Sequence, residues 1–151
     1  MADQSLEIKA TLKVLKPADQ VFEAIADPGK MSNYFISEGS GRLETGREVT
    51  WKFPEFDMTF PVRVEQVIRD RYISFYWDVG GKPLLVEINL APLGDSTVVT
   101  VTEKSMPLDE AGLNWLKGNT EGWANFLACL KAYLEYGINL RVGAFDFPRE
   151  G

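Results

Sequence analysis

The residues best able to form a binding site in this chain are large apolar side chains, most of them aromatic, that recur at strand and helix spacing. Alternation with polar residues turns one set toward a single face of a predicted sheet, and a predicted helix adds a second set. The sheet set is Trp51, Phe53, Met58, Phe60, Phe75 and Trp77, the helix set is Trp123, Phe126 and Leu127, and Tyr34 joins them from a predicted short helix. Apolar walls with a few polar groups are typical of small-molecule sites. We therefore expect an apolar cavity between sheet and helix, the alternative being that these rings form an ordinary core.

One carboxylate follows the same inward pattern. Glu103 comes two residues after Val101 and four after Val99, so a regular strand would turn it into or beside the cavity. There it could anchor a ligand or act as an acid or base. The alternative, which we expect, is that the strand ends by Thr102 and leaves Glu103 at the rim in water.

The residue types that are missing exclude several kinds of chemistry. The sequence has no His and a single Cys, Cys129. That composition excludes Ser-His-Asp and Cys-His mechanisms, an internal disulfide, and zinc sites built on His or Cys clusters. The glycine pairs at Gly39–Gly41 and Gly80–Gly81 fit no phosphate-binding motif and are expected to be turns. We expect neither a metal nor a cofactor.

Charge and hydropathy indicate where the protein acts. The 16 Lys and Arg against 22 Asp and Glu give a net charge of −6, which disfavours binding to a nucleic-acid backbone. The amino terminus lacks the basic start and apolar run of a secretory signal. No apolar stretch approaches the ~20 residues of a membrane span. We therefore expect a cytoplasmic protein that neither binds nucleic acid nor spans a membrane.

The elements that must position these residues follow from periodicity. Alternating residues predict strands at 6–14, 48–53, 58–65, 72–77, 86–90 and 99–102, with a further short strand at 41–44. Pro17 and Asp27-Pro28 begin two short helices, and a four-and-three spacing predicts a long helix from Leu113 to Gly137. The joints between strands are too short for crossover helices, so the sheet is antiparallel. The fold class is α+β, with six or seven strands curved around the last helix.

The 151 residues suit one domain, with a core at about 5–137 and a C-terminal extension at 138–151. The extension has no periodicity. Its aromatic residues Phe145 and Phe147 indicate that it packs on the body of the protein.

Several motifs resemble a known family. They are residues 17–28 (PADQVFEAIADP), 31–35 (MSNYF), 72–77 (YISFYW), and Gly122-Trp123 leading into Leu127, Leu130 and Tyr133-Leu134-Glu135. Their order is similar to the helix-grip fold of the START-like superfamily, which includes birch-pollen-allergen-like proteins. Within that superfamily the chain resembles the domain homologous to the activator of the ninety-kilodalton heat-shock chaperone ATPase. The resemblance covers about residues 5–137.

The resemblance implies three competing functions, because the family contains ligand binders, chaperone partners, stress proteins and cyclases. The first is binding of a hydrophobic small molecule, which we expect, without catalysis. The second is a chaperone-cofactor-like interaction domain, although the chain lacks room for the additional domain of the eukaryotic activators. The third is a cyclase or hydratase, whose acid-base candidates here are Glu103, Tyr34, Tyr72 and Glu38.

Overall fold

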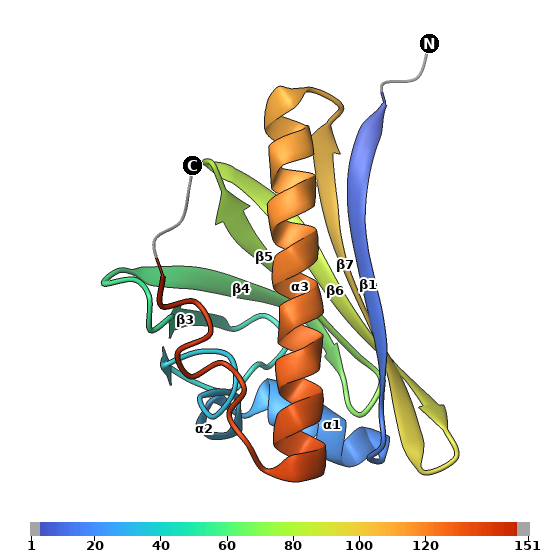
Figure 1. Ribbon diagram of the computed structural model, residues 1–151. Helices are drawn as coiled ribbons and strands as arrows, with labels where there is room; N and C mark the ends of the chain where they lie inside the picture. The colour runs from blue at the N-terminus through green and yellow to red at the C-terminus, as the bar shows by residue number, and fades with distance from the viewer. Residues whose placement is uncertain (1–3, 148–151) are drawn as a thin grey trace.

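The computed structural model, which describes residues 4–147, is a curved sheet with a long helix lying across its concave face (Figure 1). Seven strands pair in the order β1-β7-β6-β5-β4-β3-β2, and every pairing is antiparallel. The strands are β1 (Ser5–Val14), β2 (Glu38–Gly39), β3 (Glu48–Lys52), β4 (Thr59–Ile68), β5 (Tyr72–Val79), β6 (Lys82–Leu93) and β7 (Ser96–Pro107). The helices are α1 (Ala18–Ala26), α2 (Pro28–Met31) and α3 (Glu110–Tyr136). The expected α+β helix-grip fold is confirmed.

Turn and capping residues determine where these strands and helices begin and end. The β5–β6 hairpin turns through Gly80 and Gly81, both at positive φ, which suits the right-handed twist of the flanking strands. Asp109 caps α3 by accepting a hydrogen bond from the Gly112 backbone N–H at 2.8 Å, so α3 begins at Glu110, earlier than the expected Leu113. Gly137 ends α3 in the left-handed conformation and turns the chain back along the body.

Two strand predictions differ from the structure. The short strand expected at 41–44 is absent, and β2 pairs with β3 through Glu38 and Gly39 instead. The strands expected at 86–90 and 99–102 are the middles of β6 and β7, which run much further in both directions. The longer β7 keeps Glu103 inside the sheet, opposite Ile8 of β1 and Val86 of β6.

The two ends of α3 meet different surroundings. The short helices α1 and α2 lie beneath its C-terminal end (Figure 1). There Tyr34 is fully buried, its ring stacks at 5.4 Å on Tyr133, and its hydroxyl donates to the Ala24 carbonyl at 2.8 Å. The N-terminal half of α3 faces the concave sheet without such a helix beneath it. The candidate site lies along this half.

Candidate functional site

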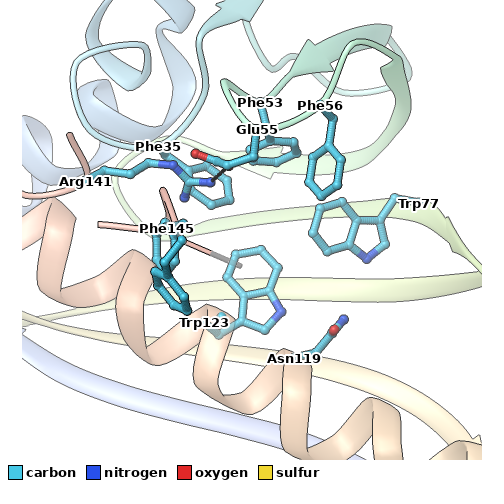
Figure 2. A pocket seen from close by; sticks show the side chains of 11 residues that line it. Phe35, Phe53, Glu55, Phe56, Trp77, Asn119, Trp123, Arg141 and Phe145 are labelled. Atoms are coloured by element: carbon cyan, nitrogen blue, oxygen red, sulfur yellow. Dashed lines mark hydrogen bonds and ion pairs between the residues drawn. The ribbon is translucent and has the colours of Figure 1, made fainter. Parts of the chain in front are cut away.

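A pocket of about 540 Å³ opens between α3, β5, the β3–β4 loop and the segment after α3 (Figure 2). Its wall is mostly aromatic: Phe35, Phe53, Phe56, Trp77, Trp123, Phe145 and Phe147. The polar lining consists of Glu55, Asn119 and Arg141, with Gly122 on the helix side. This volume and lining fit a small ligand of drug-like size.

The aromatic wall is held by contacts between rings from separate elements. Trp77 of β5 and Trp123 of α3 lie with their ring centroids 5.4 Å apart. Phe35, which follows α2, packs edge-on against Phe53 at 5.1 Å and against Phe126 at 4.7 Å. Such tilted and edge-on pairs stabilise beyond the area that they bury. The rings therefore hold one another in place around the pocket.

Behind the wall lies a carboxylate whose hydrogen-bond donors, among residues 4–147, are all neutral. Glu103 has 0% exposure. Its Oε1 accepts from the Trp123 indole N–H at 2.7 Å and from the Asn119 amide at 3.2 Å. Its Oε2 accepts from the indole N–H groups of Trp77 at 3.1 Å and Trp115 at 3.3 Å. We name these five residues the carboxylate cluster.

The carboxylate cluster follows from helix and strand geometry. Trp115, Asn119 and Trp123 are spaced by four along α3, so they share the face turned toward the sheet. Glu103 continues the buried register of Val99 and Val101, each of which has 0% exposure. A buried carboxylate without hydrogen bonds would be very costly, and the converging donors offset that cost. The expectation that Glu103 lies at the rim in water is wrong. Strand β7 continues past Glu103, and four N–H groups donate hydrogen bonds to its carboxylate.

The segment after α3 supplies the opposite wall of the pocket. The Arg141 guanidinium lies over the rings of Phe145, Phe53 and Phe35, at 4.8, 5.5 and 5.7 Å from their centroids. It also forms an ion pair with Glu55 of the β3–β4 loop. Figure 2 shows this pair beside the phenyl rings and across the pocket from Asn119. Residues 138–147 thus pack on the body of the protein, as the aromatic residues of this segment indicate. The rest of the expected extension, 148–151, lies outside the described residues.

The structure brings three of the predicted aromatic side chains to the pocket, namely Phe53, Trp77 and Trp123. It places Tyr34, Trp51, Phe75, Phe126 and Leu127 in the sealed core. Phe60 lies half-buried against Phe53 and Phe56, and Met58 is 61% exposed because it precedes β4 in a loop. The sealed residues face the same way as the pocket residues, but the rings of their neighbours cover them. Seven residues expected at the cavity are therefore not among those that line this pocket, namely Tyr34, Trp51, Met58, Phe60, Phe75, Phe126 and Leu127.

Sequence reasoning missed several residues that build the site. Trp115 and Asn119 were detectable, because a Trp-Asn-Trp series at intervals of four on a predicted helix places three N–H donors on one face. Phe56, Glu55 and Arg141 lie in segments without periodicity, so no pattern pointed to them. Phe35 lies in the 31–35 motif but was not predicted as part of the pocket.

The acid-base candidates for a cyclase or hydratase have other contacts. Tyr34 donates to a backbone carbonyl, and burial raises the pKa of its hydroxyl well above the ordinary value. Tyr72 donates to Glu87 at 2.6 Å on the outer face of the sheet, and its pKa is raised by burial and by this bond. Glu38 lies in β2 beside a different hollow. None of these three groups is among the residues that line the pocket.

Cys129, metal-ligating side chains and membrane-spanning helices are the other features that could indicate a site among residues 4–147. Cys129 is buried, and burial raises the pKa of its thiol, as expected for a small side chain packed in the core. Within residues 4–147, no three His, Cys, Asp or Glu side chains gather as they would around a metal ion. In the same range, no helix has both the length and the apolar character needed to cross a bilayer.

Comparisons with known proteins point to one family. A model of the family described as Activator of Hsp90 ATPase homolog 1-like protein matches residues 16–135. No curated protein matches the sequence. The protein SSP2350 from Staphylococcus saprophyticus is 34% identical, with a TM-score of 0.78 over 90% of this chain and 96% of that one.

Two further solved structures share the fold. DynU16, from the dynemicin biosynthetic locus, is 26% identical with a TM-score of 0.77, and the match covers 87% of this chain but 48% of DynU16. The Aha1 dimer from Colwellia psychrerythraea was solved in solution. It is 15% identical with a TM-score of 0.75, over 87% of this chain and 98% of that one, and this likeness concerns the fold alone.

Proposed function

The chain belongs to the Activator of Hsp90 ATPase homolog 1-like family, and from that premise we propose that it binds a hydrophobic small molecule. The observation that carries the proposal is the aromatic pocket of about 540 Å³ beside the N-terminal half of α3. Burying apolar ligand surface in such a wall supplies the free energy of binding. The flat rings favour a ligand with a flat apolar body.

The packing of the wall supports a pocket that exists before the ligand arrives. Trp77 of β5 and Trp123 of α3 each bond to Glu103 of β7, so each indole is held by its own element and by a second one. Arg141 and its ion pair with Glu55 hold the opposite side. A site that is already ordered loses less conformational entropy on binding than one that must form.

A pair of glycines on α3 offers a sharp test. A Cβ added at Gly122 or at Gly118 would meet no heavy atom within 4 Å, and only Gly122 lines the pocket. Leucine at either position improves helix propensity by up to about 1 kcal/mol. Gly122→Leu therefore extends a side chain into the pocket from a Cβ that meets no neighbour, and Gly118→Leu is its matched control.

The measurement is a titration with N-phenylnaphthylamine, a neutral hydrophobic probe whose emission rises in apolar surroundings. We expect saturable binding to the wild type and to Gly118→Leu, and loss of at least about tenfold in affinity for Gly122→Leu, a difference of about 1.4 kcal/mol. Equal binding by the two variants, or no binding by the wild type, would contradict the proposal.

Interaction with a heat-shock chaperone is the second candidate, and the family description favours it. Its test is separate from the pocket: the ATPase rate of an Hsp90-type chaperone is measured with and without this protein. Activation that persists in Gly122→Leu would support a function of the surface, independent of the pocket.

We also propose that the protein is located in the cytoplasm.

A further inference from the structure

We propose that the ligand of this pocket is an organic cation with a flat apolar body, an inference that rests on the small-molecule function proposed above. Two independent features carry it. One is a buried carboxylate without a counter-cation behind one wall, and the other is a cation already bound by aromatic rings at the opposite wall.

The first feature is the unbalanced charge of Glu103. Among residues 4–147, no ion pair includes this carboxylate. All four of its partners are neutral N–H donors. Buried charges in proteins are usually paired with an opposite charge. A cation bound in the pocket would bring an opposite charge to within one side chain of Glu103, because Trp77, Asn119 and Trp123 both line the pocket and bond to this carboxylate.

The indole rings extend the influence of this carboxylate toward the ligand. In Figure 2 the nitrogens of Trp77 and Trp123 lie on the side toward Asn119, and the ring bodies extend away from it. An indole that donates its N–H to a carboxylate becomes richer in electrons, which strengthens the attraction of its face for a cation. Tryptophan already provides the best face for such contacts.

The second feature is Arg141. Its guanidinium is held by Phe35, Phe53 and Phe145 and paired with Glu55, which shows that the aromatic wall accommodates a cation. This pairing also means that Arg141 neutralises Glu55 and not Glu103. Among residues 4–147, the charges that line the pocket or lie directly behind its wall are those of Glu55, Arg141 and Glu103, and they sum to −1. A net negative, aromatic site attracts organic cations and disfavours anions.

The experiment compares three ligands that share one aromatic body: naphthylmethyl-trimethylammonium, naphthylmethanol and naphthoate. Their affinities are measured by calorimetry at fixed salt for the wild type, Glu103→Gln and Glu87→Gln. The control removes the same charge from the outer face of the sheet, where Glu87 pairs with Lys104 at 3.2 Å. It therefore reports any effect of the chain's total charge.

We expect the wild type to bind the cation about 5- to 30-fold more tightly than the alcohol, and the anion most weakly. Glu103→Gln should reduce the advantage of the cation over the alcohol to within about twofold, and Glu87→Gln should keep it.

Three outcomes would overturn the inference. If the alcohol or the anion binds the wild type as tightly as the cation, the charge preference is absent and the small-molecule function still stands. If Glu103→Gln keeps the preference, Glu103 is not its source. If none of the three ligands binds while N-phenylnaphthylamine does, the pocket takes a hydrophobic molecule but not this organic cation. Should Glu103→Gln fail to fold, the wild-type ranking of the three ligands decides alone.

Discussion

The two halves of α3 pack against the same protein in opposite ways. The C-terminal half is sealed: Leu130 has 0% exposure, and Tyr34 fills the space beneath it from the turn after α2. The N-terminal half meets the sheet through the carboxylate cluster and leaves the pocket beside it. Both halves carry large side chains toward the sheet. The difference is that α1 and α2 cover the concave face of the sheet only beside the C-terminal half of α3. Beside the N-terminal half, the hydrogen bonds to Glu103 hold the helix on the sheet, and the pocket remains open.

This comparison separates stability from binding. Side chains of the sealed half should affect unfolding alone, whereas those of the open half should affect unfolding and ligand affinity together. Trp123 belongs to both, since its ring contacts Phe126 at 5.3 Å and Trp77 at 5.4 Å.

The largest effect is expected for Trp123→Ala. Removing this buried indole should lower the free energy of unfolding by about 3–5 kcal/mol and abolish probe binding. Leu130→Ala, in the sealed half, should cost about 2–5 kcal/mol and leave probe affinity unchanged. Denaturant titration and probe titration on the same samples measure both. If Leu130→Ala weakens probe binding as much as Trp123→Ala, the two halves are not distinct.

A smaller effect is expected for Glu103→Gln. The amide nitrogen of glutamine would face at least one indole N–H, leaving a buried donor without an acceptor at a cost of about 1–3 kcal/mol. Glu87→Gln, on the outer face, should stay within about 0.5 kcal/mol of the wild type. Equal stabilities for the two variants would mean that the bonds to Glu103 contribute little to holding α3 on the sheet.

The smallest effect concerns acid pH. Hydrogen bonding by Arg42, together with the charges of Arg42 and Arg69, holds the pKa of Glu23 below its ordinary value. A lowered pKa means that this interaction stabilises the fold above the unfolded-state pKa and is lost as the pH falls through the folded-state pKa. Because the pair is partly exposed, the wild type should exceed Glu23→Gln by less than about 1 kcal/mol at neutral pH. Unfolding measured from neutral to acid pH should show the two curves converging. A gap that widens toward acid would contradict this sign.

The sequence predicted the elements better than the site, for a physical reason. Apolar and polar residues alternate along a strand because one of its faces is buried. This pattern can be recognised from the sequence of a single strand, as for Val99 and Val101. The burial of Glu103 depends on donors from β5 and α3, which no single element reveals. A charged side chain near the end of a predicted strand is usually solvated, so only the Trp115–Asn119–Trp123 spacing opposite it could have indicated otherwise.

The same reasoning explains the remaining differences. Large aromatic residues that alternate with polar ones predicted a hydrophobic face of the sheet. Whether a residue of that face is sealed in the core or lines the pocket depends on which neighbouring rings cover it. Trp51 and Trp77 have similar patterns in the sequence, and only Trp77 lines the pocket. The wall formed by Arg141 and Phe145 comes from a segment without periodicity. Its position depends on the turn at Gly137 and on the ion pair with Glu55.

The central claim is that a hydrophobic ligand occupies the open half of the interface, and the four tryptophans can test it directly. Trp77 and Trp123 line the pocket, while Trp51 lies in the core and Trp115 lies behind the wall. Indole N–H resonances are followed by nuclear magnetic resonance while N-phenylnaphthylamine is added. The account predicts large shifts for Trp77 and Trp123 and small ones for Trp51 and Trp115. Shifts confined to Trp51, or no shift at saturating probe, would contradict it.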